Sequence, residues 1–511
     1  MGEIHSLRVK SPYKLMNIVD IKIKNKPNKH GYLYLKCLID DSINFNATIR
    51  ASTDDKICIY EKIEDESIET NSTYSDDDKV NINEVNEKNS KRLFCGIVQN
   101  IWTTNTNGIY YLELEALTSS VLLDIKEKSR SFQNIRMTYD DLISEILKDY
   151  SSSEFVQNIG KGKKINKPIF QFKETDWNFL KRIASELKSE LYCDIINSNV
   201  VLNFGIPNKC KYELDDDNMN YEAFKDLKRF HEVGGYNAGY NDIDFFYYQI
   251  IRRNALEIGA QIFYNQKDLY IREYEVYRNR EEIFYKYKLC RKNGVWQNIV
   301  YNQLLRGATL DGKVLEVKEE VVKIHLDIDK SQNKDEAFWF PFLPPSVNIM
   351  YSMPLVGESV RLYFPNDSSE KPIIAGCSRK NGEECEKTSE PSKRYYETEH
   401  GSEIAMLPNA LNIKGVSKKN MIMSFNDELG VHLKSSKKLK INSDEGIVIK
   451  TPKRVKINAH NQILLMKRNK SHSVLIEDGV YIKGNNVVMN GNSSEIYDSF
   501  EEREEDSYHE R

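Results

Sequence analysis

The sequence has 511 residues, of which 40% are apolar and 29% charged, and its formal net charge is −4. This length suffices for roughly three domains of about 150 residues, and the apolar content is that of soluble globular proteins. No apolar run reaches the ~18 residues that a membrane-spanning helix needs. The net charge is too small to indicate a nucleic-acid-binding protein. Thirty Tyr against four Trp favour a β-rich fold, since Tyr packs well on pleated surfaces.

The N-terminal part of the chain is typical of short strands separated by turns. Apolar and β-branched residues concentrate at 19–23, 32–39 and 45–49. Residues 61–90 differ, because they hold ten acidic residues and three Lys with few apolar side chains. Such a composition buries too little apolar surface to offset the entropy of ordering. We therefore predict a flexible acidic insertion at 61–90.

Two helices are predicted after these strands. Thr138 is a good N-cap with Asp141 three residues on, close to a capping box, and apolar residues then recur at helical spacing. A second helix is predicted over residues 175–188, with Trp177 on its apolar face. Taken alone, that face indicates core packing.

Beyond residue 305 the pattern changes to short, regularly spaced strands. Residues 306–378 contain five or six of them, which indicates a small barrel of OB type. Residues 379–400 are polar and charged without periodicity, and we predict a linker there.

An eight-residue repeat occupies residues 431–465. Each unit carries two apolar residues at alternating positions, and the residues between are mostly Lys, Ser, Asn, Asp and Gly. The alternation places each pair on one face of a very short strand, and the polar residues form the corner. We predict that ten side chains form the core of a needle, namely Val431, Leu433, Leu439, Ile441, Ile447, Ile449, Val455, Ile457, Ile463 and Leu465.

One such strand cannot be stable by itself. It buries two side chains at roughly 2 kcal/mol each, against a backbone ordering cost of about 1–2 kcal/mol per residue. The units must therefore stack. A single chain could coil with three units per turn, or three chains could wind together, each supplying one face of a triangular prism. The other possibility is an ordinary antiparallel meander, although a meander rarely keeps a constant period over five strands.

The repeat region is basic, and the C-terminal tail is acidic. Residues 416–470 hold eleven Lys and two Arg against four acidic residues, a charge that a nucleic-acid-binding β-ribbon would share. Phe425 is the only aromatic residue there, however, and stacking on bases requires aromatic side chains. We therefore expect a solvated prism surface and no nucleic acid. Residues 495–511 carry eight acidic residues and two Arg, which indicates a charged tail.

The sequence shows no motif for catalysis, a metal or a cofactor. The patterns HExxH, GxSxG and GxxxxGK[ST] are absent, and the nine His are dispersed. The eight Cys form no CxxC, and the N-terminus has no apolar core of a secretion signal, so we expect reduced structural thiols. We predict a non-enzymatic protein without catalytic residues, cofactors or metals.

Three segments resemble VgrG-like tail-spike proteins of contractile injection systems and phage baseplates. IFQFKETDWNFLKRIASELKSELYCDI (169–195), preceded by RSFQNIRMTYDDLISEILKDY (130–150), is similar to the hub signature of that family. GATLDGKVLEV and MPLVGESVRLYFPN resemble its OB-type barrel, and the eight-residue repeat resembles its triple-stranded β-helix. The residues that match the hub signature are Thr175, Asp176, Trp177, Phe179, Leu180 and Arg182.

The resemblance implies a mainly β homotrimer with few helices and five segments. They are a hub with two β-barrel modules at 1–305, an OB-type barrel at 306–378, a linker at 379–400, an intertwined β-helical needle at 401–492 and an acidic tail at 493–511. It further implies that three hubs form a pseudo-sixfold ring on the hexameric tail tube among baseplate proteins. A PAAR-type tip protein or an effector would cap the needle, which would contact a target membrane or cell wall transiently.

Some features of the family are missing, and two other functions remain open. The linker is too short for a lysozyme domain, and His472 and His509 are isolated, so no His-x-His metal tip is implied. The alternatives are a spike-associated peptidoglycan hydrolase and a β-helical adhesin or nucleic-acid-binding OB protein. Without a signal peptide, we expect cytoplasmic assembly followed by incorporation into a released or fired particle.

Overall fold

The computed structural model divides into two compact units, Met1–Asn381 and Gly382–Arg511. Most of the predicted acidic insertion at 61–90, and all of the predicted tail at 493–511, lie outside the described residues. The described residues are 7–43, 45–62, 90–213, 221–264, 266–280, 282–343, 352–366, 371–377, 387, 390–398, 400–416, 421–468 and 470–486.

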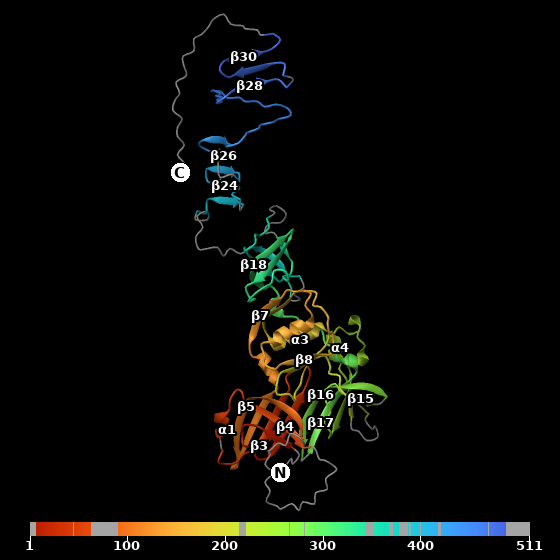
Figure 1. The fold of residues 1–511 in the computed structure, drawn as a ribbon. Helices are drawn as coiled ribbons and strands as arrows, with labels where there is room; N and C mark the ends of the chain where they lie inside the picture. The colour runs from red at the N-terminus through yellow and green to blue at the C-terminus, as the bar shows by residue number, and fades with distance from the viewer. Residues whose placement is uncertain are drawn as a thin grey trace, which may run out of the picture. The chain divides into compact units, whose positions relative to one another are not determined.

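A 12-stranded sheet dominates the first unit (Figure 1). Its order is β1-β4-β5-β6-β3-β2-β16-β17-β14-β13, with β15 paired to β16 and β12 paired to β15. The strands are β1 Leu7–Lys10, β2 Ile18–Asn25, β3 Tyr32–Leu38, β4 Lys56–Lys62, β5 Ser90–Thr106, β6 Ile109–Leu117, β12 Lys211–Glu213, β13 Tyr221–Lys225, β14 Phe246–Arg252, β15 Gln261–Tyr264, β16 Lys267–Asn279 and β17 Glu282–Cys290.

The two hub barrels implied by the resemblance are joined in the protein, and neither closes separately among the described residues. β2 pairs antiparallel with β16, with Ile23 opposite Val276 and Asn25 opposite Tyr274. This pairing satisfies backbone groups on β2 that an edge strand would leave open. In the described residues, the strands of both halves of the predicted hub therefore belong to one continuous sheet.

Two local predictions for this region are wrong. Residues 45–49, expected as a strand, mostly form helix α1 (Asn46–Arg50), which has no fully buried residue, although Ala47 packs against the core of the large sheet. The expectation that all cysteines are reduced fails for Cys58 and Cys95. They lie directly opposite each other on β4 and β5 and form a disulfide, because strand pairing joins residues 37 apart in sequence.

A smaller α/β layer follows the first half of the sheet. Helix α2 (Tyr139–Leu147) begins at the capping box of Thr138 and Asp141, and α3 (Asp176–Glu186) begins at Thr175, which confirms both helices. They pack in one apolar core with the sheet β10-β11-β8. The strands of this layer are β7 Glu127–Phe132, β8 Glu154–Gln157, β9 Ile169–Thr175, β10 Leu191–Cys193 and β11 Val201–Phe204.

Short helices complete this part of the first unit. Each of them carries at least one buried residue, and α4 contributes Phe230 to the core of the large sheet. They are α4 Leu227–Glu232 and the 3-10 turns η2 Ser119–Asp124, η3 Gly235–Ala238, η4 Asp242–Phe245, η5 Lys292–Val295 and η6 Gln303–Leu305.

A closed five-stranded barrel ends the first unit, as the spacing of strands over 306–378 predicted. Its order is β18-β19-β20-β22-β21, and its core is apolar. The strands are β18 Thr309–Lys318, β19 Val321–Leu326, β20 Phe340–Leu343, β21 Ser359–Tyr363 and β22 Ile373–Cys377.

The second unit contains two small antiparallel sheets, β23-β24-β25-β26-β27 and β28-β29-β30. Residues 435–462, between them, are all described and form no strand. The strands are β23 Arg394–Glu397, β24 Glu403–Leu407, β25 Ala410–Lys414, β26 Ile422–Asn426, β27 Gly430–Lys434, β28 Ile463–Met466, β29 Ser473–Ile476 and β30 Val480–Lys483.

The cap of α2 can be tested directly. We expect Thr138→Ala to destabilise this helix by about 1 kcal/mol, because it removes the acceptor for the Asp141 N–H. Hydrogen exchange of the α2 amides measures the loss. Ser144→Ala, on the exposed side of the same helix, should not accelerate exchange, and equal effects of the two changes would contradict the capping role.

Candidate functional site

The predicted hub residues surround a buried carboxylate. Asp176, the first residue of α3, is fully buried. Its oxygens accept from Lys128 Nζ at 2.7 Å, an Arg130 guanidinium nitrogen at 2.5 Å, Gln171 Nε2 at 2.8 Å and the Tyr150 hydroxyl at 2.7 Å. A buried carboxylate is tolerated only when charge and hydrogen bonds compensate it. Asp176 therefore ties β7, β9 and α2's C-terminal turn to the start of α3.

The same contacts shift the pKa values of two groups in this cluster. Burial, followed by the hydrogen bond to Asp176, raises the pKa of the Tyr150 hydroxyl, which therefore remains a donor at neutral pH. A hydrogen bond from Lys128 lowers the pKa of Asp149, which lies at the solvent side of the cluster. The two cations are thus shared between one buried and one half-exposed carboxylate.

Thr175 and Trp177 anchor the helix start from two sides. The Thr175 hydroxyl accepts from the Asn178 N–H at 3.2 Å and donates to Asp124 at 2.5 Å. The Trp177 ring is 2% exposed and lies 4.1 Å, centroid to centroid, from the ring of His30. These contacts hold α3 against η2 and the β2–β3 hairpin.

Phe179, Leu180 and Arg182 complete the predicted set. Phe179 stacks on Phe132 with centroids 5.9 Å apart, and Leu180 is fully buried in the same core. Arg182 is 3% exposed and donates to the Phe170 carbonyl at 2.6 Å and to Glu174 at 3.0 Å. All six predicted hub residues therefore lie in one connected site.

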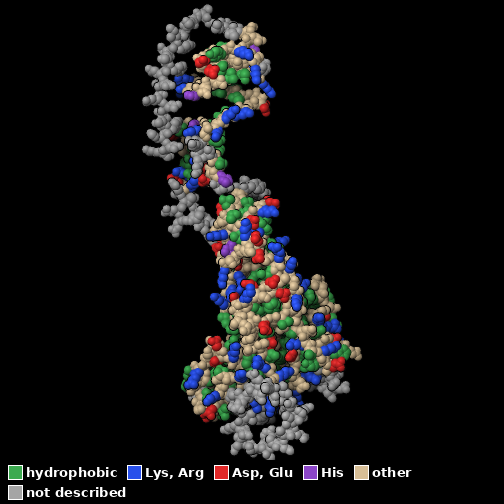
Figure 2. Space-filling model, viewed as in Figure 1, with side chains coloured by type: hydrophobic (Ala, Val, Ile, Leu, Met, Phe, Trp, Pro, Cys, Tyr) green, Lys and Arg blue, Asp and Glu red, His purple; other side chains and the backbone are tan. Residues whose placement is uncertain are grey.

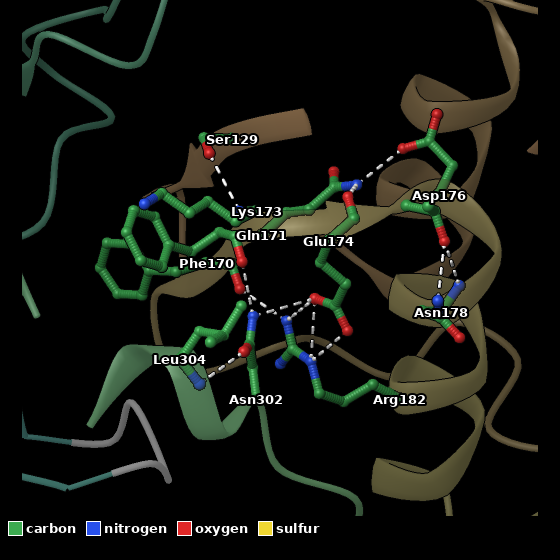
Figure 3. A network of polar contacts seen from close by, with 12 residues as sticks. Ser129, Phe170, Gln171, Lys173, Glu174, Asp176, Asn178, Arg182, Asn302 and Leu304 are labelled. Atoms are coloured by element: carbon green, nitrogen blue, oxygen red, sulfur yellow. Dashed lines mark hydrogen bonds and ion pairs between the residues drawn. The ribbon is translucent and has the colours of Figure 1, made fainter. Parts of the chain in front are cut away.

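Residues that the sequence reading missed connect this site to the barrel. Figure 3 shows Arg182, Glu174 and Asn302 converging between β9, α3 and the turn before the barrel. The Asn302 amide also donates to the Phe172 carbonyl at 2.8 Å. Its only sequence signal was a polar residue just ahead of the first barrel strand.

Phe170 belongs to the core of the barrel although it lies on β9. Its ring is fully buried, 4.8 Å from Phe364 in an edge-to-face contact and 6.3 Å from Phe340. A second tie joins the Ser131 N–H and hydroxyl to the Asp329 carboxylate at 2.7 and 2.5 Å. Burial raises the pKa of Asp329. The hub site and the barrel thus share packing and hydrogen bonds.

The arrangement is a structural junction between the hub region and the barrel. The charged groups at its centre compensate one another, and its apolar residues fill two cores. No cluster of three or more His, Cys, Asp or Glu suited to a metal occurs in the described part of the chain. Within that same part, no helix combines the length and apolar character needed to cross a membrane.

The ten predicted needle residues lie at a second site and are not buried in the single protomer. Val431 and Leu433 lie on β27 and are 64% and 49% exposed. Ile463 is half-buried on β28, and Leu465 beside it is 59% exposed. The six residues between them are 52–72% exposed on the strandless segment, namely Leu439, Ile441, Ile447, Ile449, Val455 and Ile457. The chain therefore does not bury these pairs by coiling on itself.

The ends of the repeat form meanders within the protomer. In β28-β29-β30, Ile463 lies opposite Ile476, and Ile476 lies opposite Val480. In the other sheet, Leu433 lies opposite Met423, which lies opposite Ile413. The antiparallel alternative therefore holds at both ends, and each small sheet carries an apolar row that the protomer leaves partly uncovered. Hydrophobic side chains are visible at the surface of the second unit among Lys and Arg (Figure 2).

Comparison with known proteins identifies a family and several structures that this chain resembles. Residues 64–187 match the family model of the phage tail baseplate hub (GPD). The E. coli c3393 protein, a type VI secretion component with structural similarity to T4 bacteriophage tail proteins gp27 and gp5, is similar over 73% of this chain and 100% of its own. The identity is 13% and the TM-score 0.50. VgrG in the half-lidded Francisella PdpA–VgrG complex shows 13% identity over 84% of this chain and 87% of that chain, with a TM-score of 0.49. No curated protein matches the sequence.

The fold of this chain, and its match over residues 64–187, are similar to those of phage tail baseplate hub proteins. This likeness agrees with the resemblance to VgrG-like proteins that the three motifs indicated.

The buried carboxylate gives a sharp test of the junction. We expect Asp176→Asn to destabilise the α3 region by about 3–5 kcal/mol, because Lys128 and Arg130 lose their buried counter-charge. Hydrogen exchange of the α3 amides measures this loss. Asp149→Asn is the matched control: it contacts the same two cations from a side chain that is 51% exposed, and should cost about 1 kcal/mol or less. Equal losses would show that burial does not matter here.

The shared core gives a second test. We expect Phe170→Ala to destabilise the barrel by about 3–5 kcal/mol, although the residue lies outside the barrel strands, because it empties part of that core. Protection of the β19 amides against hydrogen exchange should fall. Phe155→Ala, in the hub core, is the control and should leave β19 unchanged. An unaltered barrel in the Phe170 variant would contradict the shared packing.

Proposed function

We propose that this protein is the trimeric spike of a contractile injection system, in which the hub adapts the tail tube to a needle that pierces the target envelope. The observation that carries the proposal is the row of paired apolar side chains at 431–465, more than half of them over 50% exposed in the single protomer. Exposed apolar area of this extent marks an interaction surface.

The backbone of the same segment supports association between copies. Residues 435–462 form no strand, so neither a helix nor a sheet of the protomer pairs their N–H and C=O groups. Backbone groups that become buried require partners. Two further copies of the chain would supply both the missing strand pairs and the cover for the apolar pairs, while the intervening Lys residues stay in solvent.

The mechanism follows from such an arrangement. In a needle of three mutually wound chains, one chain cannot unfold without disrupting the others, so axial load is shared over many backbone hydrogen bonds. The Asp176 cluster and Phe170 would transmit the load from hub to barrel. In this proposal the hub binds a hexameric tube protein and baseplate proteins, and the needle carries a PAAR-type tip protein or an effector. Assembly takes place in the cytoplasm, before the particle is released or fired.

The trimer can be tested with a matched pair of variants. Light scattering of the wild type should give about three times 59.6 kDa. We expect Ile449→Asp to reduce this mass towards that of a single chain, because three carboxylates would be buried around one axis.

Val448→Asp is the control. Val448 is 89% exposed and alternates with Ile447 and Ile449, so it faces away from the row of pairs. This variant should retain the wild-type mass. A wild-type protein that stays monomeric, or a Val448 variant that dissociates as readily as the Ile449 variant, would refute the proposed packing.

A further inference from the structure

A hollow of about 520 Å³ opens between the β2–β3 hairpin and α3, beside Trp177. Four lysines line it: Lys24, Lys26 and Lys29 from the hairpin and Lys181 from α3. Tyr32 and Trp177 contribute aromatic surface. No Asp or Glu is among the lining residues.

The four ammonium groups are not neutralised by carboxylates. Among the described residues, none of them lies within ion-pair distance of Asp or Glu, whereas Lys22, on the same strand, pairs with Glu275 at 2.7 Å. Lys24 lies instead 5.5 Å from the centroid of the Tyr32 ring. The hollow is thus a concentrated positive site on a molecule whose net charge is slightly negative.

The carboxylates of Asp124 and Glu174 act on Lys181, and both already have other partners, since Glu174 pairs with Arg182 at 3.0 Å. Asp124 accepts from the Thr175 hydroxyl at 2.5 Å and lies 3.4 Å from His30 Nε2. Burial lowers the pKa of His30, so its ring adds no charge at neutral pH. Four lysine charges therefore line a hollow where the carboxylates of Asp124 and Glu174 both act on Lys181.

The environment of Lys181 indicates how a bound anion would affect the charges in the hollow. Its side chain is half-buried beside Trp177, with Nζ 5.8 Å from the ring centroid. Burial lowers its pKa, Asp124 and Glu174 oppose this shift, and Lys29 acts in the same direction as burial. An anion in the hollow would stabilise this partly desolvated ammonium group and screen it from Lys29.

We propose that the hollow binds a compact, multiply charged phosphate group. A lone carboxylate would neutralise one of four charges, whereas an oligophosphate matches several within a small volume. Lysine serves as a point charge for phosphate, and no Arg, whose planar fork suits carboxylates, lines the hollow. The phosphate could belong to a soluble oligophosphate or to phospholipid headgroups.

The test is calorimetric titration of the full-length protein with sodium tripolyphosphate. We expect saturable binding that weakens with added salt. The double variant Lys26→Gln/Lys181→Gln should bind about tenfold more weakly, the loss expected for two partly exposed ion pairs. The control Lys228→Gln/Lys334→Gln removes the same charge from side chains that are 86% and 55% exposed elsewhere, and should bind as the wild type does.

Two further arms separate the sources and the alternatives. Sedimentation with phosphatidylglycerol–phosphatidylcholine vesicles, compared with phosphatidylcholine alone, assigns headgroups if it depends on Lys26 and Lys181. Binding of tripolyphosphate without vesicle binding assigns a soluble oligophosphate. The proposal is overturned if tripolyphosphate does not bind, if both double variants bind equally, or if hexaglutamate binds through these lysines and tripolyphosphate does not. The last result would assign an acidic protein partner instead.

Discussion

The carboxylate of Asp176 is the constraint on which the hub depends. Full burial of a carboxylate is costly unless charge and hydrogen bonds surround it, and here two cations, an amide and a phenol do so. Those donors come from β7, β9 and the end of α2. Satisfying one charge therefore fixes the positions of three elements around the start of α3.

That fixed arrangement determines how the barrel is attached. β9 begins with Ile169 in the hub core and Phe170 in the barrel core, so one strand belongs to both. Arg182 holds the same strand through the Phe170 carbonyl, and Asp329 reaches back to Ser131. Apolar packing and directional hydrogen bonds thus resist separation together, which suits a protein proposed to carry force.

The second unit differs from the hub, because its apolar side chains are not buried within one protomer. Its apolar pairs are regular in sequence but open to solvent in one protomer, and 435–462 makes no strand pairs. A hub core is complete within one chain, whereas the repeat leaves both its apolar face and its backbone incomplete. The proposed trimer explains both deficits with one symmetric association.

Local patterns in the sequence determined the helices and the barrel, whereas the hub residues came from the resemblance of residues 169–195 to a known family. The Thr138 capping box and the one-sided face of α3 depend on neighbours three or four residues away, so the sequence suffices to predict them. The eight-residue period likewise predicted which side chains share a face, but left the number of chains open.

Long-range pairing was decided only by the tertiary structure. The joining of β2 to β16, the disulfide between Cys58 and Cys95, and the placement of Phe170 in the barrel core all unite residues far apart in the chain. The same holds for the four lysines of the hollow, which come from a hairpin and from a helix about 150 residues later. No local period encodes such contacts, because they arise when separate elements bury their faces against each other.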